Sequence, residues 1–189
     1  MNQRFMDAVE ENPVIAAVKN MDGLEQCCSL EDIRIVFILF GDICSIGGIV
    51  RRIKAAGKLA MVHVDLIGGL STREVAVDFI RQNTDADGII TTKPSLVKRG
   101  RELSLYTVLR YFLLDSMAYE NILQQQSVVR PDFIEVLPGV MPGIIKSLCR
   151  ELKVPVIAGG LISDREAVLN ALSAGAAAIS STNHQVWRL

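Results

Sequence analysis

Short apolar runs recur along the whole chain, and they constrain its fold more than any other feature of the sequence. Successive runs start 18 to 29 residues apart, which leaves room for one helix and two short loops between each pair. This rhythm is typical of a parallel sheet whose strands alternate with helices. The eight runs begin near Val14, Ile35, Leu59, Gly88, Tyr106, Phe133, Pro155 and Ala177.

Eight strand–helix units favour a sheet that closes into a barrel. The alternative is an open, doubly wound sheet of the flavodoxin type, which uses about five or six strands. A chain of 189 residues is short for a barrel, so the loops must be short as well. No linker or low-complexity tract divides the chain. We therefore expect one α/β domain, a small (β/α)8 TIM barrel over residues 1–189.

The stretches between the apolar runs carry signals for the ends of helices. Glycines follow several amphipathic segments, and proline or small polar residues precede others. The patterns predict a helix over 46–56 that ends at Gly57, a helix over 142–152, and a helix that opens at 163–166 and closes at Gly175. A further helix is predicted to be capped at 71–74 and to turn Val75, Phe79 and Ile80 toward the core.

Composition excludes several classes of protein. Half of the residues are hydrophobic, enough for one sizeable core, but the longest aliphatic and aromatic run, Ile35–Phe40, is too short to span a bilayer. The stretch Met1–Asp7 has no signal-peptide core, and the four cysteines show no metal-ligand spacing. We therefore expect a cytoplasmic protein with reduced thiols, without a metal and without a membrane partner. The net charge of −1 gives no global attraction to nucleic acid.

Two segments near the end of the chain predict a phosphate site. Each is a short apolar strand that stops in small residues, at Gly159–Gly160 and at Ser180–Ser181. Glycines let backbone N–H groups approach an anion, and the helix start that follows adds its positive dipole end. The loops after strands seven and eight of a barrel often form such a pocket. The alternative is that Gly159–Gly160 is only a tight turn between strand and helix.

Charged and polar side chains gather at the ends of several predicted strands. Because side chains alternate between the two faces of a strand, every second residue faces the lumen of a barrel. This alternation turns His63, Asp65 and Glu135 inward. Burying many charges is costly unless they pair with each other or with a ligand, so the set predicts a ligand site or a salt-bridge network. Its members are Lys19, His63, Asp65, Lys93, Arg110 and Glu135.

Several stretches resemble one known family. The most specific are the sequences His-Val-Asp-Leu-Ile at 63–67 and Ile-Glu-Val-Leu-Pro-Gly at 134–139. On these residues the chain resembles the glycerol-3-phosphate-responsive antiterminator family, the regulators of glycerol uptake operons. The similarity extends to Pro13–Asn20, Gly88–Lys93, Arg110–Ser116, Ala158–Ile162 and Ser180–Asn183. One departure is Leu109, at a position where the family pattern suggests a polar residue.

The resemblance implies a cytoplasmic, non-catalytic barrel that needs no cofactor. Its effector would be glycerol 3-phosphate, and its partner would be a leader mRNA on which it lets transcription pass a terminator. Backbone N–H and hydroxyl groups of Gly159, Gly160, Ser180 and Ser181 would hold the phosphate. Glu135, Asp65 and His63 would hold the glycerol hydroxyls, and Lys19, Lys93 or Arg110 would balance the charge.

A phosphosugar enzyme on the same scaffold is the alternative function. Isomerases, epimerases and synthases use an acid and a base at the reacting carbon, and Asp65 with Glu135 would supply that pair. Lys93 or Lys19 would then serve as electrophile or Schiff-base amine. However, Lys19 and Arg110 end the first and fifth strands, and two cations there suit anion binding better than proton transfer. Together with the family resemblance, this favours a sensor.

Two clusters of basic residues are candidates for RNA contact. One is formed by Lys98, Arg99 and Arg101, and the other by Arg51 and Arg52. Neither contains the interleaved aromatic residues of base-stacking modules, and each is equally well explained as a solvated helix face. A homo-oligomer is compatible with the sequence.

Overall fold

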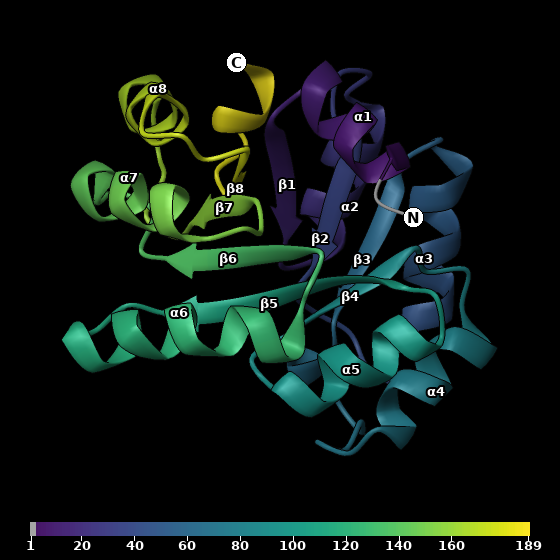
Figure 1. Cartoon of the computed structure of the whole chain (residues 1–189). Helices are drawn as coiled ribbons and strands as arrows, with labels where there is room; N and C mark the ends of the chain where they lie inside the picture. The colour runs from purple at the N-terminus through teal and green to yellow at the C-terminus, as the bar shows by residue number, and fades with distance from the viewer. Residues whose placement is uncertain (1–2) are drawn as a thin grey trace.

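The computed structural model describes residues 3–189, and its eight parallel strands form a closed barrel in chain order (Figure 1). This confirms the predicted (β/α)8 architecture. Six of the eight strands begin at the residue predicted from the apolar runs, and the last two begin one residue later. The strands are β1 (Val14–Val18), β2 (Ile35–Ile38), β3 (Leu59–His63), β4 (Gly88–Thr91), β5 (Tyr106–Phe112), β6 (Phe133–Leu137), β7 (Val156–Gly159) and β8 (Ala178–Ser181).

Helices cover the outside of the barrel, and seven of them connect successive strands. After β8 the described chain forms only a short 3-10 helix, and one α-helix precedes β1. The helices are α1 (Gln3–Glu11), α2 (Met21–Ser29), α3 (Ile46–Ala55), α4 (Val75–Asn83), α5 (Pro94–Glu102), α6 (Ser116–Val129), α7 (Pro142–Glu151) and α8 (Arg165–Ser173), with 3-10 helices η1 (Val64–Leu66) and η2 (Val186–Arg188). Within residues 3–189, no helix is long and apolar enough to cross a bilayer.

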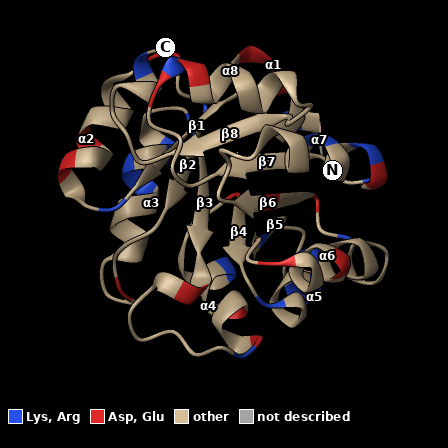
Figure 2. Cartoon of the chain, turned by 90° about the vertical axis from the view of Figure 1, so that its left-hand side faces the viewer, with Lys and Arg blue, Asp and Glu red and all other residues tan. Residues whose placement is uncertain are grey.

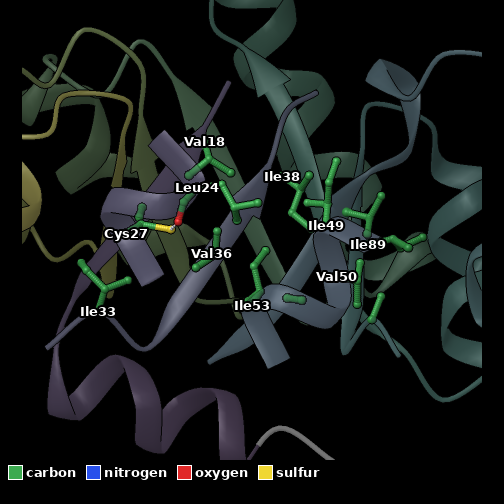
Figure 3. Packing of buried hydrophobic residues seen from close by; sticks show 14 of the residues in the cluster. Val18, Leu24, Cys27, Ile33, Val36, Ile38, Ile49, Val50, Ile53 and Ile89 are labelled. Carbon is green, nitrogen blue, oxygen red and sulfur yellow. Dashed lines mark hydrogen bonds between the residues drawn. The ribbon is translucent and has the colours of Figure 1, made fainter. Parts of the chain in front are cut away.

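The strands are buried on both faces, as parallel strands under helices are. Along β2, Ile35 and Phe37 face the lumen, while Val36 and Ile38 face the helices. Figure 3 shows this outer layer, where Val36 and Ile38 pack with side chains of α2 and α3, among them Leu24 and Ile53. Each such buried aliphatic side chain stabilises the fold by about 1.5–3 kcal/mol. The outer layer therefore fixes α2 and α3 against the barrel.

Helix α1 supplies a side chain that fills the amino end of the barrel. Phe5 is fully buried, and its ring centroid lies 4.3 Å from that of Phe133 and 5.6 Å from that of Tyr106. It packs with lumen residues such as Ile15 and Phe37. The lumen floor is thus packed with apolar side chains. Polar groups and open space are left to the opposite end, where the strands terminate.

Several predicted helix ends are confirmed. Helix α3 ends before Gly57, which has φ +76°, and α8 is followed by Gly175 with φ +105°. Both values lie in the left-handed region that favours glycine after a helix. The Asp164 side chain caps α8 by accepting a hydrogen bond from the backbone N–H of Ala167, 2.8 Å away.

The predicted cap of the helix after β3 is wrong. Helix α4 begins at Val75, with Glu74 at the cap position and no side-chain cap bond. Of the three residues predicted to face the core, Val75 is 62% exposed, whereas Ile80 is buried and Phe79 is partly buried against the core. The cap prediction failed because the helix starts four residues after Ser71, too far for the Ser71 side chain to cap it. Ile144 of α7 is likewise 41% exposed, whereas Ile145 and Leu148 of the same helix are buried.

Candidate functional site

Two neighbouring strands, β5 and β6, bring a buried ion pair to the carboxyl end of the lumen. Arg110 on β5 and Glu135 on β6 are direct register partners, and the Arg110 Nε lies 2.6 Å from Glu135 Oε2. Ser180 on β8 donates its hydroxyl to Glu135 Oε1, also at 2.6 Å. Glu135 is fully buried and Arg110 nearly so. A buried carboxylate is tolerated only when it is paired and hydrogen-bonded, and Glu135 meets both conditions.

Gly159 makes room for this network. A Cβ at Gly159 would lie 2.6 Å from Glu135 Oε1 and 2.7 Å from the Ser180 hydroxyl oxygen. Both distances are shorter than real Cβ contacts allow, so any side chain at this position would displace the carboxylate or the hydroxyl. The lack of a side chain at Gly159 is thus explained by packing inside the protein. Its role in binding phosphate stays a prediction.

A cavity of about 360 Å³ opens above the ion pair. Its volume lies within the range of small-molecule sites, roughly 300–1,000 Å³. Arg110 uses its Nε for Glu135, and residues 3–189 offer no acceptor to its two terminal nitrogens, which keep some solvent exposure. An anion in the cavity can therefore reach them. The lining residues are Ala17, Leu39, Arg110, Glu135, Leu137, Gly160–Ser163 and Ser180–Asn183.

The loop between β7 and α8 presents backbone donors to the same cavity. Gly160 and Leu161 have φ values of +73° and +62°, so two successive residues lie in the left-handed region. This conformation costs a leucine roughly 1–2 kcal/mol. Among the described residues, no protein acceptor meets the backbone N–H groups of Gly160, Leu161 or Thr182. Unpaired N–H groups beside the N-terminus of α8 form an arrangement that suits a phosphate.

The hydroxyls of the two predicted phosphate-binding serines are engaged inside the protein. Ser180 donates to Glu135, and Ser181 donates to the carbonyl oxygen of Ile162 at 2.7 Å. Ser181 Oγ also accepts from the backbone N–H of Asn183, and its carbonyl accepts from the indole of Trp187. The serines therefore hold the two loops in place. The donors beside the cavity that remain unpaired are backbone N–H groups and the terminal nitrogens of Arg110.

His63 is buried at the end of β3, as predicted, but it does not line the cavity, and its Nδ1 has no hydrogen-bond partner. It is the only buried side-chain nitrogen or oxygen in residues 3–189 without one. Burial and the positive charge of Arg110 lower the pKa of His63 from 6.5 to about 4, and the negative charge of Asp65 offsets this only in part. The ring is thus uncharged at neutral pH and is equipped for hydrogen bonds to a neutral polar group.

Asp65 does not line the cavity, because β3 ends at His63 and the chain then enters η1, so the alternation no longer applies. Its carboxylate accepts hydrogen bonds from the Thr91 hydroxyl at 2.8 Å and from the Thr92 N–H and hydroxyl at 2.7 and 2.8 Å. Burial raises the pKa of Asp65, but these hydrogen bonds lower it by more, so the pKa lies below its ordinary value of 3.8. Asp65 fixes the turn between β4 and α5.

Lys19 and Lys93 also lie outside the cavity. Strand β1 ends at Val18 and β4 at Thr91, so both lysines belong to the turns that follow. Lys19 is exposed and Lys93 precedes α5 at its cap position. The predicted cluster of three cations is thus reduced to Arg110. Leu109 packs outward against α5 and α6, so the family departure lies on the helix-facing side of β5.

The cavity also contains residues that sequence reasoning missed. Leu39 and Leu137 continue the inward alternation of Phe37 and Glu135, and this pattern would have identified them. Ala17 follows the same rule on β1. Thr182 and Asn183 lie within the stretch that resembles the family, but no local pattern assigns them to a cavity.

Two of the five residues in the two basic clusters, Arg99 and Arg52, are paired with carboxylates. Arg99 pairs with Asp78 at 2.6 Å and with Glu102 at 2.7 Å, and Arg52 lies 3.5 Å from Glu25. Arg101 donates to the carbonyl oxygen of Val129 at 3.4 Å. Lys98 and Arg51 pair with no carboxylate of residues 3–189. Figure 2 shows basic and acidic residues interspersed around the barrel, with no broad basic face in this view.

Comparisons with known proteins assign the chain to a family. The family model described as glycerol-3-phosphate responsive antiterminator matches residues 14–187. The chain is 43% identical over 185 residues to the uncharacterised protein YgcP of Escherichia coli (strain K12), a match that covers 98% of this chain and 96% of that protein.

Two crystal structures share both fold and sequence with the chain. The glycerol uptake operon antiterminator regulatory protein of Listeria monocytogenes (strain 4b F2365) is 31% identical, with a TM-score of 0.90 over 94% of this chain and 95% of that one. A glycerol uptake operon antiterminator-related protein of Thermotoga maritima MSB8 is 32% identical, with a TM-score of 0.82 over 93% and 98%. The resemblance seen in the sequence is confirmed, and the chain belongs to the glycerol-3-phosphate responsive antiterminator family.

Proposed function

We propose that the chain senses glycerol 3-phosphate and, bound to a leader mRNA, promotes antitermination of glycerol uptake or utilisation genes in the cytoplasm. Membership of a family of responsive antiterminators supports a regulatory role. The observation that carries the ligand assignment is the polar end of the lumen. There, the free nitrogens of Arg110 and the unpaired N–H groups of the β7–α8 loop line one cavity of about 360 Å³.

The phosphate group is assigned to the side of the cavity formed by Gly160, Leu161 and Thr182. Their backbone N–H groups and the dipole of α8 favour an anion. Arg110 adds a planar pair of donors, and each charge-assisted hydrogen bond contributes about 1.5–3 kcal/mol. Because Glu135 balances the charge of Arg110 when the cavity is empty, the bare site is not strongly cationic. The affinity for a phosphate ester would then come from hydrogen bonds donated by the backbone N–H groups and by Arg110, and not from a strong positive charge.

The glycerol end is assigned to Glu135, which lines the cavity, and to His63, which is buried at the end of β3 outside the cavity lining. Each Glu135 oxygen accepts one hydrogen bond within the protein, and a carboxylate has further acceptor sites for a ligand hydroxyl. His63 adds an uncharged ring whose Nδ1 lacks a partner. Inorganic phosphate would leave these acceptors unused. We therefore expect a phosphate ester with hydroxyl groups to bind more tightly than phosphate alone.

Several observations favour a sensor over a phosphosugar enzyme. The acid–base pair suggested by the sequence was Asp65 with Glu135. Asp65 is directed at Thr91 and Thr92, and its lowered pKa makes it a weak base. Glu135 is held in an ion pair. We accordingly propose that the protein has no catalytic residues and no cofactor, and that glycerol 3-phosphate acts as an effector only.

Binding to a leader mRNA is proposed from the family. Of the five basic residues suggested by the sequence, Lys98 and Arg51 are free of ion pairs within the described chain and are the better candidates for phosphate contacts. Arg52, Arg99 and Arg101 would first have to leave their present partners. The steep salt dependence of such contacts provides a direct signature.

Calorimetry with glycerol 3-phosphate, glycerol and inorganic phosphate tests the ligand assignment. We expect selective binding of the ester without turnover, and tighter binding of a leader transcript of a glycerol uptake operon when the ester is present. Conversion of the ester into a product would show that the protein is an enzyme and would contradict the proposed sensor function. Equal affinity for the ester and for inorganic phosphate would contradict the assignment of Glu135 and His63 to the glycerol hydroxyls.

A further inference from the structure

Large hydrophobic side chains are exposed together at one sector of the barrel mouth. They lie on or next to the loops that follow β5, β6 and β7, and Leu114, Met117 and Leu161 are 86%, 72% and 75% exposed. A soluble protein rarely leaves such side chains grouped without a partner. We call this surface the apolar rim, which consists of Phe112, Leu114, Met117, Val140, Ile144 and Leu161.

The apolar rim borders a hollow between α6 and α7, which lie next to each other at the left of Figure 1. The hollow has a volume of about 410 Å³, larger than the proposed ligand cavity, and most of its lining is apolar, including Leu113, Leu114, Met141 and Ile144. Ser116, Tyr119 and Ser147 add polar groups. The shape and chemistry suit apolar side chains from an approaching helix.

The charged side chains that line the two hollows beside the apolar rim are all acidic. The 410 Å³ hollow is lined by the carboxylates of Asp115 and Glu120 and by no lysine or arginine. A second hollow of about 180 Å³, on the other side of Val140, is lined by Asp164 and Glu166 and again by no basic residue. Four carboxylates therefore border the surface. They would repel RNA phosphates, and an identical face of a second copy would bring like charges together.

From this combination we propose that the apolar rim is the docking site for a protein partner, specifically a basic amphipathic helix. Leucine-like anchors spaced at i, i+3, i+4 and i+7 would enter the hollow between α6 and α7. Lysine or arginine residues beside those anchors would face Asp115 and Glu120. This surface is separate from Lys98 and Arg51, so protein and RNA would bind to different parts of the barrel.

Leu161 connects the apolar rim to the proposed ligand cavity, because it belongs to both. Its left-handed backbone is part of the loop whose N–H groups are assigned to phosphate. Gly160 in the same loop accepts a hydrogen bond from Gly139, next to Val140, at 3.0 Å. A ligand that orders this loop would therefore also order the apolar rim. This coupling, unlike the docking site itself, rests on the proposed function.

A pair of synthetic helices tests the proposal, with fluorescence anisotropy as the measurement. One peptide carries leucine on one face and lysine on the other, and the second replaces every lysine by glutamate. We expect saturable 1:1 binding of the lysine peptide and at least tenfold weaker binding of the glutamate peptide. The double variant Leu114→Ala/Met117→Ala should lose at least tenfold in affinity, and Glu120→Gln should reduce the salt dependence. Leu169→Ala, which truncates an exposed leucine outside the apolar rim, is the matched control.

Equal affinity of the double variant and the wild type for the lysine peptide would overturn the proposal, as would equal binding of both peptides. Dimerisation that the double variant abolishes in sedimentation experiments would assign the surface to a second copy, and competition by leader RNA would assign it to nucleic acid. Calorimetry with glycerol 3-phosphate on the same variants separates the two proposals. If no ester binds while the peptide does, the proposed function fails and the docking site stands.

Discussion

Arg110 and Glu135 face each other across the hydrogen-bonded pair β5 and β6, and their side chains meet at 2.6 Å inside the barrel. Glu135 binds the Nε of the guanidinium, so the two terminal nitrogens of Arg110 remain available to a ligand in the cavity. The pair therefore combines a structural and a binding role. Glu135 positions the cation that we assign to the phosphate, and it presents its remaining acceptor sites to the ligand.

Glu135→Ala should lower both stability and ligand affinity. Removing one partner of a buried ion pair leaves an uncompensated charge and costs about 3–5 kcal/mol. Urea unfolding measures this loss, and calorimetry measures the affinity for glycerol 3-phosphate. Because the alanine variant could be too unstable for titration, Glu135→Gln provides a second measurement at unchanged size. A glutamine variant with wild-type affinity would contradict the assignment of Glu135 to the site.

Gly159→Ala should destabilise the protein although it adds only a methyl group. The new Cβ would lie 2.6 Å from Glu135 Oε1, and overpacking of this kind typically costs about 1–3 kcal/mol. Gly143→Ala is the matched control, because a Cβ at Gly143 meets nothing within 4 Å and alanine favours the α7 helix. Thermal unfolding of both variants should therefore shift in opposite directions. A stable Gly159→Ala protein would show that the carboxylate has room to move.

Three cations suggested by the sequence should differ in their effect on ligand binding. Arg110→Ala removes donors that line the cavity and should weaken glycerol 3-phosphate binding by about 10- to 150-fold for each charge-assisted bond lost. Lys19→Ala and Lys93→Ala remove side chains outside the cavity and should change affinity less than threefold. Calorimetry at one ionic strength compares the three variants directly. Equal losses at all three positions would indicate long-range charge attraction in place of direct contact.

RNA binding should depend on the two basic residues that are free of ion pairs. Reversing charge in Lys98→Glu/Arg51→Glu should weaken binding of a leader transcript and make the dependence of log K on log salt shallower by about one to two units. Lys153→Glu, an exposed position between α7 and β7, is the control for a change in net charge. Filter binding over a salt series gives both values. Identical salt slopes for the wild type and the double variant would place the RNA elsewhere.

The barrel itself could be predicted from the sequence because the signal is repeated eight times. Each apolar run is buried on both faces, so the runs mark the strands without any knowledge of their partners. Gly57 and Gly175 ended helices as predicted, since the left-handed conformation after a helix is a local property. Helix α1 was missed although its buried residues Phe5 and Val9 have helical i, i+4 spacing, and its position at the end of the barrel depends on contacts with much later residues.

The site was predictable where strands continue and not where they end. Glu135 lies within β6, so alternation placed it in the lumen. Arg110 was predicted at the end of its strand, and it lies inside β5 because that strand continues to Phe112. Lys19, Asp65 and Lys93 lie one or two residues beyond a strand end, where the backbone turns and alternation fails. Ser180 and Ser181 were found as residues, but their hydroxyl partners Glu135 and Ile162 come from other elements. Such partners are fixed by tertiary packing alone.

The buried His63 should make stability depend on pH in a defined window. Its pKa is lowered from 6.5 to about 4 by burial and by Arg110, so between these values the unfolded chain binds a proton that the folded chain excludes. Stability should therefore fall as the pH drops from about 6.5 to 4, by roughly 3 kcal/mol in total. Asp65, whose pKa is lowered from 3.8, contributes only below this window.

Urea unfolding at pH 7.5, 5.5 and 4.5 measures this dependence, and His63→Gln should flatten it because glutamine does not titrate. The variant is expected to resemble the wild type most closely near pH 4.5, where the wild type has lost most of the contribution of a neutral His63. A wild-type profile that is flat between pH 6.5 and 4.5 would mean that the folded protein accepts the proton. In that case His63 would be charged beside Arg110, and its assignment as a neutral partner for glycerol hydroxyls would fail.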